Sequence, residues 1–177
     1  MNWYETVFEV IDMRSFSNLW YWIGLAVLWS SVSHWVLGVP YDSLLRAKRG
    51  KPEGAMQDLE TLVNLNVKRI LYIAEVSGVW IALFGSAFLS ALAIVAFYYR
   101  IEFATAVFLL VFPMFIVGFL SARTARLIRD REDKGETLIR RMIRHRFSTQ
   151  FVGMISIFVT AMYGMYTNLY VGPNAGF

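Results

Sequence analysis

The chain has 177 residues, of which 57% are hydrophobic and 16% aromatic, and it carries a formal net charge of +4. A soluble domain of this length cannot bury so much apolar surface, whereas lipid accepts it, so the composition predicts an integral membrane protein. The absence of cysteine excludes disulfides, thiol nucleophiles and cysteine-ligated metal clusters.

The first segment, residues 1–16, is expected to form a short interfacial helix. Glu5, Glu9 and Asp12 recur at i, i+4 and i+7, and apolar side chains, many of them aromatic, fill the opposite face. This pattern is typical of a helix that lies in the membrane interface with its aromatic side chains at headgroup depth. The segment lacks the basic residues of a cleavable signal peptide. A helix that docks a partner protein is the alternative interpretation.

Long apolar runs follow, and each is close to the roughly 20 residues that a helix needs to cross the hydrocarbon core. They are continuous and do not alternate apolar with polar residues, which excludes a transmembrane β-barrel. The sequence therefore predicts an all-α integral membrane protein. It would form a single membrane domain over residues 1–177 with four transmembrane helices, at residues 17–39, 71–97, 103–122 and 151–171.

The two longest connections also have helical character. In residues 40–70, Pro40 ends the first span, and apolar residues recur at helical spacing after the turn at residues 50–54. No helix breaker separates them from the second span, so one long helix is expected from Gly54 to Phe97. Residues 123–150 are expected to form a helical hairpin that extends the third and fourth spans and turns at Lys134-Gly135.

Basic residues fix the orientation of these spans. All of the 17 Lys and Arg residues except Arg14 and Arg100 lie in the two connecting segments, residues 40–70 and 123–150. With four spans, both segments fall on the same side, and the positive-inside rule makes that side cytoplasmic. Both termini and the short hairpin at residues 98–102 would then face the periplasm or exterior.

The second connecting segment has more basic than acidic residues, and we refer to its principal arginines as the basic collar. Anionic lipid headgroups gain about 1 kcal/mol for each basic residue near the surface, so bound anionic phospholipid is expected here. An acidic cytoplasmic partner is the other candidate. No nucleic-acid-binding module is recognisable, and nucleic acid is not an expected partner. The collar consists of Arg123, Arg126, Arg129, Arg140, Arg141 and Arg144.

Two ionisable residues, His34 and Glu75, lie inside predicted spans and are candidate site residues for that reason. They lie at similar depth near the cytoplasmic side, so a contact between them is geometrically possible. Three interpretations are open. In the first, Glu75 has a structural role and reaches Arg123, Lys68 or Arg69. A proton or ion relay is the second interpretation. The third is a haem or chlorin ligand at His34, but no second intramembrane histidine is present, and no cofactor or metal is predicted.

The second span also carries small residues at every fourth position: Ala74, Gly78, Ala82, Ser86 and Ser90. Such a face lets another helix backbone approach closely, which drives helix packing in membranes. Its partner can be another helix of this chain, a second copy or a foreign helix. A weaker version occurs in the fourth span at Gly153, Ser156, Thr160 and Gly164. Pro113 is expected to kink the third span and to free a carbonyl near Leu109.

Two stretches, residues 12–20 (DMRSFSNLW) and 33–42 (SHWVLGVPYD), resemble a small family of alphaproteobacterial inner-membrane proteins. Members of this family are often labelled as a component of the Suf iron–sulfur assembly complex. The resemblance runs over most of the chain and implies a location in the bacterial cytoplasmic membrane. It also implies a link to cofactor assembly or membrane redox complexes. It assigns no functional residues.

The sequence favours a non-enzymatic accessory, assembly or anchoring subunit that acts through helix–helix and lipid contacts. It would belong to a larger membrane complex or to a homo-oligomer. The alternative is a small homo-oligomeric ion channel or proton-coupled transporter that uses His34 and Glu75. An enzyme is the third candidate, but the serine-rich stretch before His34 is too generic to define a catalytic arrangement.

Overall fold

The computed structural model describes residues 16, 18–50 and 53–170, and helices dominate it. The expected interfacial helix over residues 1–16 lies, except for Phe16, outside the described residues. In chain order the elements are α2 (Leu19–His34), β1 (Trp35–Val36), β2 (Val39–Pro40), α3 (Tyr41–Arg49), α4 (Ala55–Ala93), the π-helical turn η2 (Ile94–Tyr98), α5 (Glu102–Arg131) and α6 (Gly135–Tyr170).

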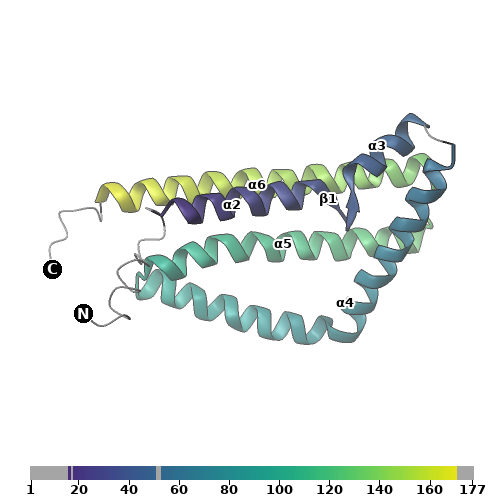
Figure 1. Cartoon of the computed structure of the whole chain (residues 1–177). Coiled ribbons are helices and arrows are strands. Elements are labelled where there is room, and N and C mark those ends of the chain that lie inside the picture. The colour runs from purple at the N-terminus through teal and green to yellow at the C-terminus, as the bar shows by residue number, and fades with distance from the viewer. Residues whose placement is uncertain (1–15, 17, 51–52, 171–177) are drawn as a thin grey trace, which may run out of the picture.

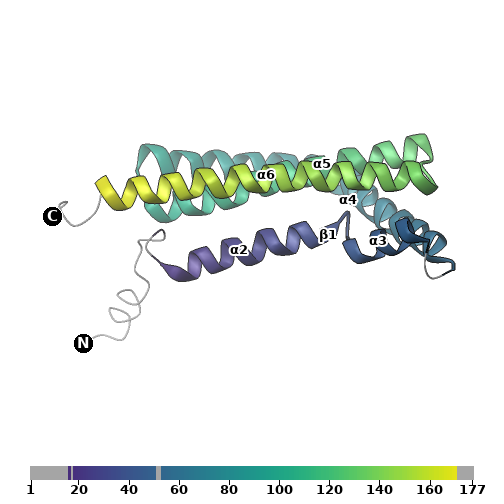
Figure 2. The ribbon, with the colours of Figure 1, turned by 90° about the horizontal axis from the view of Figure 1, so that it is seen from above.

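Three helical stretches are long and apolar enough to cross a membrane: Ala55–Tyr98, Glu102–Arg131 and Gly135–Leu169. They belong to α4 with η2, to α5 and to α6, and Figure 1 shows these helices following one another side by side. Seen from above, the three overlap in one layer, and α2 lies beside that layer (Figure 2). The protein is therefore a helical protein with membrane-spanning character. The 16 residues of α2 extend over only about 24 Å.

The first apolar run leaves the helical conformation at His34, before the expected boundary at residue 39. Asn18 caps the start of α2 by accepting a hydrogen bond from the Trp20 N–H. After His34 the chain forms a minimal antiparallel hairpin in which β1 pairs with β2. Its two turn residues, Leu37 and Gly38, have φ values of 52° and 75°, the combination that a tight type I′ turn requires. This turn ends α2.

Contacts from α6 and α4 hold the hairpin in place. The guanidinium carbon of Arg146 lies 3.4 Å from the centroid of the Tyr41 ring, and Arg146 Nε donates to the carbonyl of Ser33 at 3.4 Å. A cation near the last carbonyls of α2 also complements the helix dipole. From α4, the Asn66 side-chain amide donates to the carbonyl of Gly38 at 3.4 Å. The connection between α2 and α3 is thus part of the packed structure.

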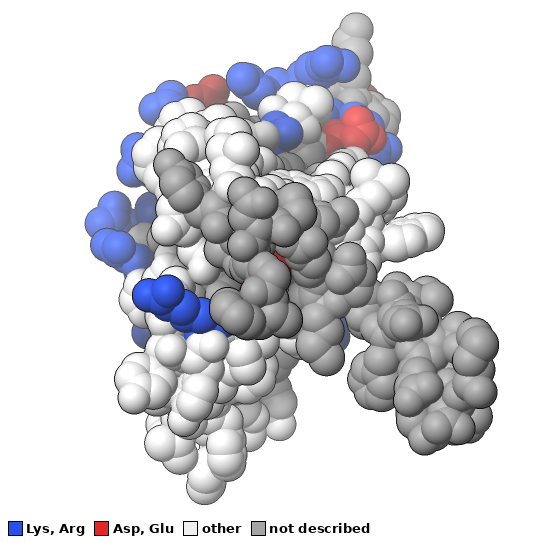
Figure 3. Space-filling view, turned by 90° about the vertical axis from the view of Figure 1, so that its left-hand side faces the viewer, with Lys and Arg blue, Asp and Glu red and all other residues white. Residues whose placement is uncertain are grey.

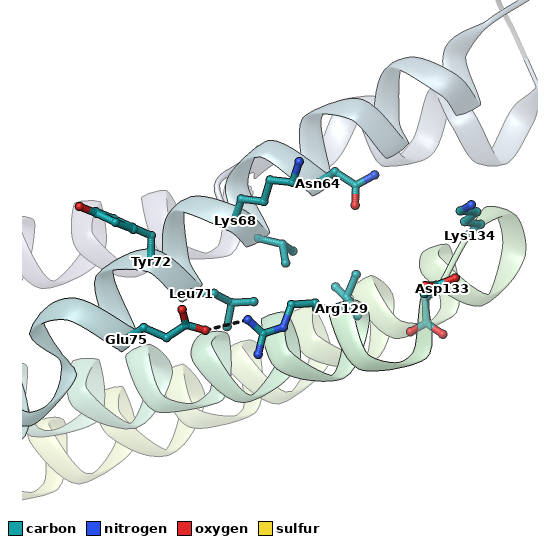
Figure 4. A pocket seen from close by; sticks show the side chains of 11 residues that line it. Asn64, Lys68, Leu71, Tyr72, Glu75, Arg129, Asp133 and Lys134 are labelled. Carbon is teal, nitrogen blue, oxygen red and sulfur yellow. Dashed lines mark hydrogen bonds and ion pairs between the residues drawn. The ribbon is translucent and has the colours of Figure 1, made fainter.

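One long helix, α4, confirms the expected continuity from Gly54 to Phe97. Its first half buries a stripe at every fourth position, formed by Leu59, Val63, Val67 and Leu71. Figure 1 shows that α4 then changes direction and runs on beside α5, and Figure 4 places Glu75 close to the bend. Ser77-Gly78 follows within one turn, and Gly/Ser pairs are an established cause of helix bends.

The largest buried cluster lies where α3, the hairpin and the first half of α4 meet the ends of α5 and α6. We call it the basic-end core, since the basic segments surround it. A smaller cluster, centred on Leu25, Trp29 and Val117, joins α2 to α5 and α6. The basic-end core contains Val36, Leu37, Val39, Leu44, Ala47, Leu59, Val63, Val67, Leu71, Ala125, Ile128, Leu138, Ile139 and Met142.

The hairpin between α5 and α6 turns where it was expected, at Lys134-Gly135. The left-handed backbone of Glu132 (φ 48°) and Gly135 (φ 54°) makes the reversal. An ion pair between Asp133 and Arg141 closes the turn, and their side chains are only 8% and 18% exposed. Glu60 on α4 accepts the N–H of Gly135 at 2.8 Å, which satisfies a free donor at the start of α6. The turn is therefore bound to α4 as well.

Small residues on α6 bring α2 close to the layer of long helices. A Cβ added to Gly153 would lie 2.7 Å from the Trp29 ring, and one added to Gly164 would lie 3.2 Å from the Trp22 ring. Ser156 and Thr160 on the same stripe are buried. The weaker of the two small-residue patterns is therefore used inside the chain.

Pro113 frees the expected carbonyl in α5. The hydroxyl of Ser156 on α6 donates to the carbonyl of Leu109 at 3.4 Å. Proline lacks the N–H that would otherwise bond to this carbonyl, so a side chain of the neighbouring helix satisfies it.

The hairpin turn yields a first prediction. Replacing Gly38 with alanine places a Cβ 3.2 Å from Asn66 Oδ1, at a φ of 75°. Because L-residues are disfavoured in this region, we expect Gly38→Ala to lower the free energy of unfolding by about 1–2 kcal/mol. Thermal unfolding in detergent measures the change. The matched control is Gly24→Ala, where no atom lies within 4 Å of the new Cβ and a helix favours alanine. Equal losses in the two variants would contradict the assigned turn.

Candidate functional site

A polar groove of about 410 Å³ lies between the first half of α4 and the end of α5 (Figure 4). It contains one of the two predicted intramembrane residues, Glu75, and one arginine of the basic collar, Arg129. Its volume falls within the range of roughly 300–1,000 Å³ that is usual for ligand pockets. The lining residues are Asn64, Val67, Lys68, Leu71, Tyr72, Glu75, Ile128, Arg129, Glu132, Asp133 and Lys134.

The helical period of α4 explains why the groove is polar. Asn64, Lys68 and Glu75 lie on one face of α4, next to the stripe that enters the basic-end core. The remaining face carries exposed apolar side chains, among them Leu65, Tyr72 and Val76. This half of α4 therefore has a buried face, a polar face on the groove and an apolar face on the outside.

Glu75 forms an ion pair with Arg129, in which Oε1 lies 2.7 Å from Nη1 (Figure 4). Both side chains are more than half exposed, so in water solvent would screen the pair and leave it only a small contribution to stability. The hydrogen bond that Arg129 donates to Glu75 raises the pKa of Arg129 above its ordinary value, and Asp130 at 3.6 Å adds to this. By sequence, the possible partners of Glu75 are Arg123, Lys68 and Arg69. In the structure the partner is Arg129.

His34 does not join this site. Its ring packs edge-on against Trp35, with 5.8 Å between the ring centroids. Among the described residues no hydrogen bond or ion pair connects His34 with Glu75, whose carboxylate is engaged by Arg129. The structure thus shows no direct contact between the two predicted intramembrane residues.

The small residues at every fourth position from Ala74 to Ser90, which we call the α4 small face, point mostly away from the rest of the described chain. Ala82, Ser86 and Ser90 are exposed, and a Cβ added to Gly78 would have no atom within 4 Å. Ala74 and Gly78 are half-buried. α4 instead contacts α5 through Gly85, where an added Cβ would lie 2.4 Å from the Phe115 ring.

The basic collar divides into paired and unpaired arginines. Arg129 pairs with Glu75, Arg140 with Glu136 at 3.1 Å, and Arg141 with Asp133. In the described part of the chain, no ion pair involves Arg123, Arg126 or Arg144, and all three are exposed. Seen along the bundle from the end that holds the connection between η2 and α5, basic side chains gather at the upper and left margins (Figure 3). The lowest part of that view is uncharged.

His145, in the segment between the third and fourth predicted spans, is buried in the interface between α5 and α6. His145 is 7% exposed, with Nδ1 3.1 Å from Thr124 Oγ1 and Nε2 3.4 Å from Ser121 Oγ. Because the Ser121 hydroxyl donates to the carbonyl of Val117, the proton is assigned to Nε2, which donates to Ser121. His145 follows Leu138 and Met142 at i+7 and i+3, so its buried position could have been predicted from the periodicity.

This arrangement explains the chemistry of His145. Burial lowers the pKa of His145 to about 4, so the ring is neutral at pH 7. The Ser121 hydroxyl donates away from the ring, which is the wrong direction for a nucleophile that a base activates. Within the described residues, no group of three or more His, Asp or Glu side chains could hold a metal ion. His145 is therefore a structural residue.

Comparisons of the chain with protein-family models, with curated proteins and with solved structures give no match.

The neutral His145 yields a prediction about pH. Because its pKa is lowered in the folded state, the unfolded chain binds more protons between about pH 6.5 and pH 4. Stability is then greatest above pH 6.5 and falls as the pH drops toward 4, by an amount on the order of 3 kcal/mol. Melting in detergent between pH 7.5 and 4.5 measures this. We expect His145→Gln to flatten the profile, and an unchanged slope in that variant would assign the acid sensitivity to other groups.

Proposed function

We propose that this protein is a non-enzymatic accessory, assembly or anchoring subunit of a membrane complex, and that it acts through helix–helix and lipid contacts. The observation that carries this proposal is the exposed small face on the second half of α4. That half contacts α5 along one side, and most of its remaining surface is apolar and uncovered.

The two small-residue stripes of the chain support this interpretation by their contrast. On α6, Gly153 and Gly164 are buried beneath aromatic rings of α2. On α4, Ala82, Ser86 and Ser90 recur at similar spacing but are exposed, with none of the described helices covering them. The hydrophobic effect does not drive helices together in lipid, so lipid-embedded helices pack where small residues let their backbones approach closely. A helix of another protein is the partner that suits the α4 small face.

The proposal includes a topology with four spans in the bacterial cytoplasmic membrane. α2 supplies the first span, since it lies along α6 and contacts it through Trp22 and Trp29. The basic-end core and the basic collar then face the cytoplasm, and both termini face the periplasm. Anionic phospholipid would contact Arg123, Arg126 and Arg144, which have no internal ion-pair partner among the described residues.

The resemblance to proteins labelled as components of the Suf iron–sulfur assembly complex gives the proposal a class of partner. The chain has no cysteine with which to hold a cluster itself. We therefore propose a role beside a cofactor-assembly or redox complex at the membrane, in which this chain provides attachment and no chemistry.

Co-purification tests the proposal. The tagged chain is extracted in a gentle detergent, and mass spectrometry identifies what it retains. We expect a stoichiometric partner complex, and we expect Gly78→Leu and Ala82→Leu to reduce its recovery about tenfold, which corresponds to about 1.4 kcal/mol. Ala87→Leu is the matched control, because Ala87 is equally exposed on a different face of α4. Equal recovery in all variants would contradict a role for the α4 small face, and recovery of a pure homo-oligomer would favour the channel.

A further inference from the structure

The charges that line the groove between α4 and α5 are only partly matched within the chain. Glu75 and Arg129 neutralise one another, and Asp133 pairs with Arg141. Among the described residues, no ion pair engages Lys68, Lys134 or Glu132, and all three are exposed. The groove therefore offers a ligand two ammonium groups and one carboxylate.

The charged residues of the groove are spread along its length (Figure 4). Glu75 and Arg129 lie toward one end and Asp133 and Lys134 at the other, while Lys68 lies on α4 across from Arg129, with its side chain directed along α4 toward Asn64. Lysine side chains are long and have several rotatable bonds, so both ammonium groups can adjust to an anion in the groove. A ligand that bears both signs of charge fits this lining better than a purely anionic one, because the carboxylate of Glu132 has no ion-pair partner among the described residues and attracts a cationic group.

The groove lies beside an apolar surface at the basic end of the molecule. Leu65, Tyr72 and Val76 are exposed on the adjacent face of α4, at 61%, 66% and 60% respectively. Tyr72 belongs to both surfaces, since it also lines the groove. Tyrosine is favoured at the depth of the headgroups, where one side of the ring meets hydrocarbon and the hydroxyl meets water. A ligand with a charged head and apolar chains can therefore occupy both surfaces at once.

We propose that this groove binds the headgroup of an aminophospholipid, a phosphodiester that carries a primary ammonium group, as in phosphatidylethanolamine. Lys68 and Lys134 contact the phosphate, and the carboxylate of Glu132 accepts hydrogen bonds from the ammonium group. The acyl chains lie on the apolar face of α4. This site is distinct from the anionic lipid contacts of the collar, and it does not depend on the proposed role as an accessory subunit.

Native mass spectrometry of the delipidated full-length protein in detergent tests the site. The probes are phosphatidylethanolamine, phosphatidylglycerol and phosphatidylcholine with identical acyl chains, and the water-soluble glycerophosphoethanolamine. We expect phosphatidylethanolamine to be retained best, because phosphatidylglycerol brings no cation and the choline group has no N–H to donate. Glycerophosphoethanolamine shares the headgroup chemistry but should bind far more weakly, because it cannot use the apolar face.

Three substitutions assign the contacts. We expect Lys68→Gln and Lys134→Gln each to weaken retention about fivefold, the loss expected for one basic group at a membrane surface. Glu132→Gln should remove the preference for ethanolamine over choline. Arg144→Gln is the control, since Arg144 is an exposed collar residue outside the groove. Equal retention of the three lipids, a preference for phosphatidylglycerol, tight binding of the soluble headgroup, or an equal loss in the control would each overturn the proposal.

Discussion

The absence of a hydrophobic driving force between helices in lipid is the constraint on which this structure depends. Lipid tails are as apolar as leucine, so burying leucine against leucine inside the membrane gains no hydrophobic free energy. The chain accordingly places its largest apolar cluster at the basic end, where α4, α5 and α6 extend beyond their most apolar stretches. Leu59, Val63, Leu138 and Met142 are almost completely buried in this cluster. In the topology that we propose, this end of the molecule lies in water, and the hydrophobic effect drives their burial.

Within the membrane the same constraint makes small residues decisive. α6 uses Gly153 and Gly164 to bring the rings of α2 against its backbone, and Ser156 satisfies the carbonyl that Pro113 leaves free. Beyond its bend, α4 contacts α5 near Gly85 and turns its other small residues outward. The bend separates two parts of α4. The first half packs in the basic-end core, and the second half runs beside α5 with its small-residue face exposed.

Much of this fold could be predicted from the sequence, because periodicity and helix breakers are local signals. The continuity of α4, the turn at Lys134-Gly135 and the free carbonyl of Leu109 all followed from residue spacing. The end of α2 did not, because Trp35, Val36 and Leu37 are apolar and continue the run in composition while the backbone turns. The positive φ of Leu37 could not be predicted, because leucine rarely adopts this backbone conformation.

The candidate site was less predictable, since it depends on the relative rotation of helices. Sequence located Glu75 correctly as an ionisable residue near the basic side, but its partner depends on the bend of α4 and on the register against α5. The groove lies between the polar face of α4 and the end of α5, whereas hydrophobic periodicity indicates only the buried face of α4. His145 is the opposite case, because its spacing from Met142 already indicated burial.

In the topology that we propose, the packed basic end lies outside the lipid, on the cytoplasmic side of the membrane. Because the chain has no cysteine, single cysteines can be introduced and labelled with a membrane-impermeant maleimide. We expect Arg100→Cys, in the connection between η2 and α5, to be labelled in intact spheroplasts, and Arg131→Cys to be labelled only after the membrane is opened. Ser90→Cys, within the apolar half of α4, should resist labelling in both cases. Labelling of Arg131→Cys in intact spheroplasts would place the basic end outside the cell and contradict the account.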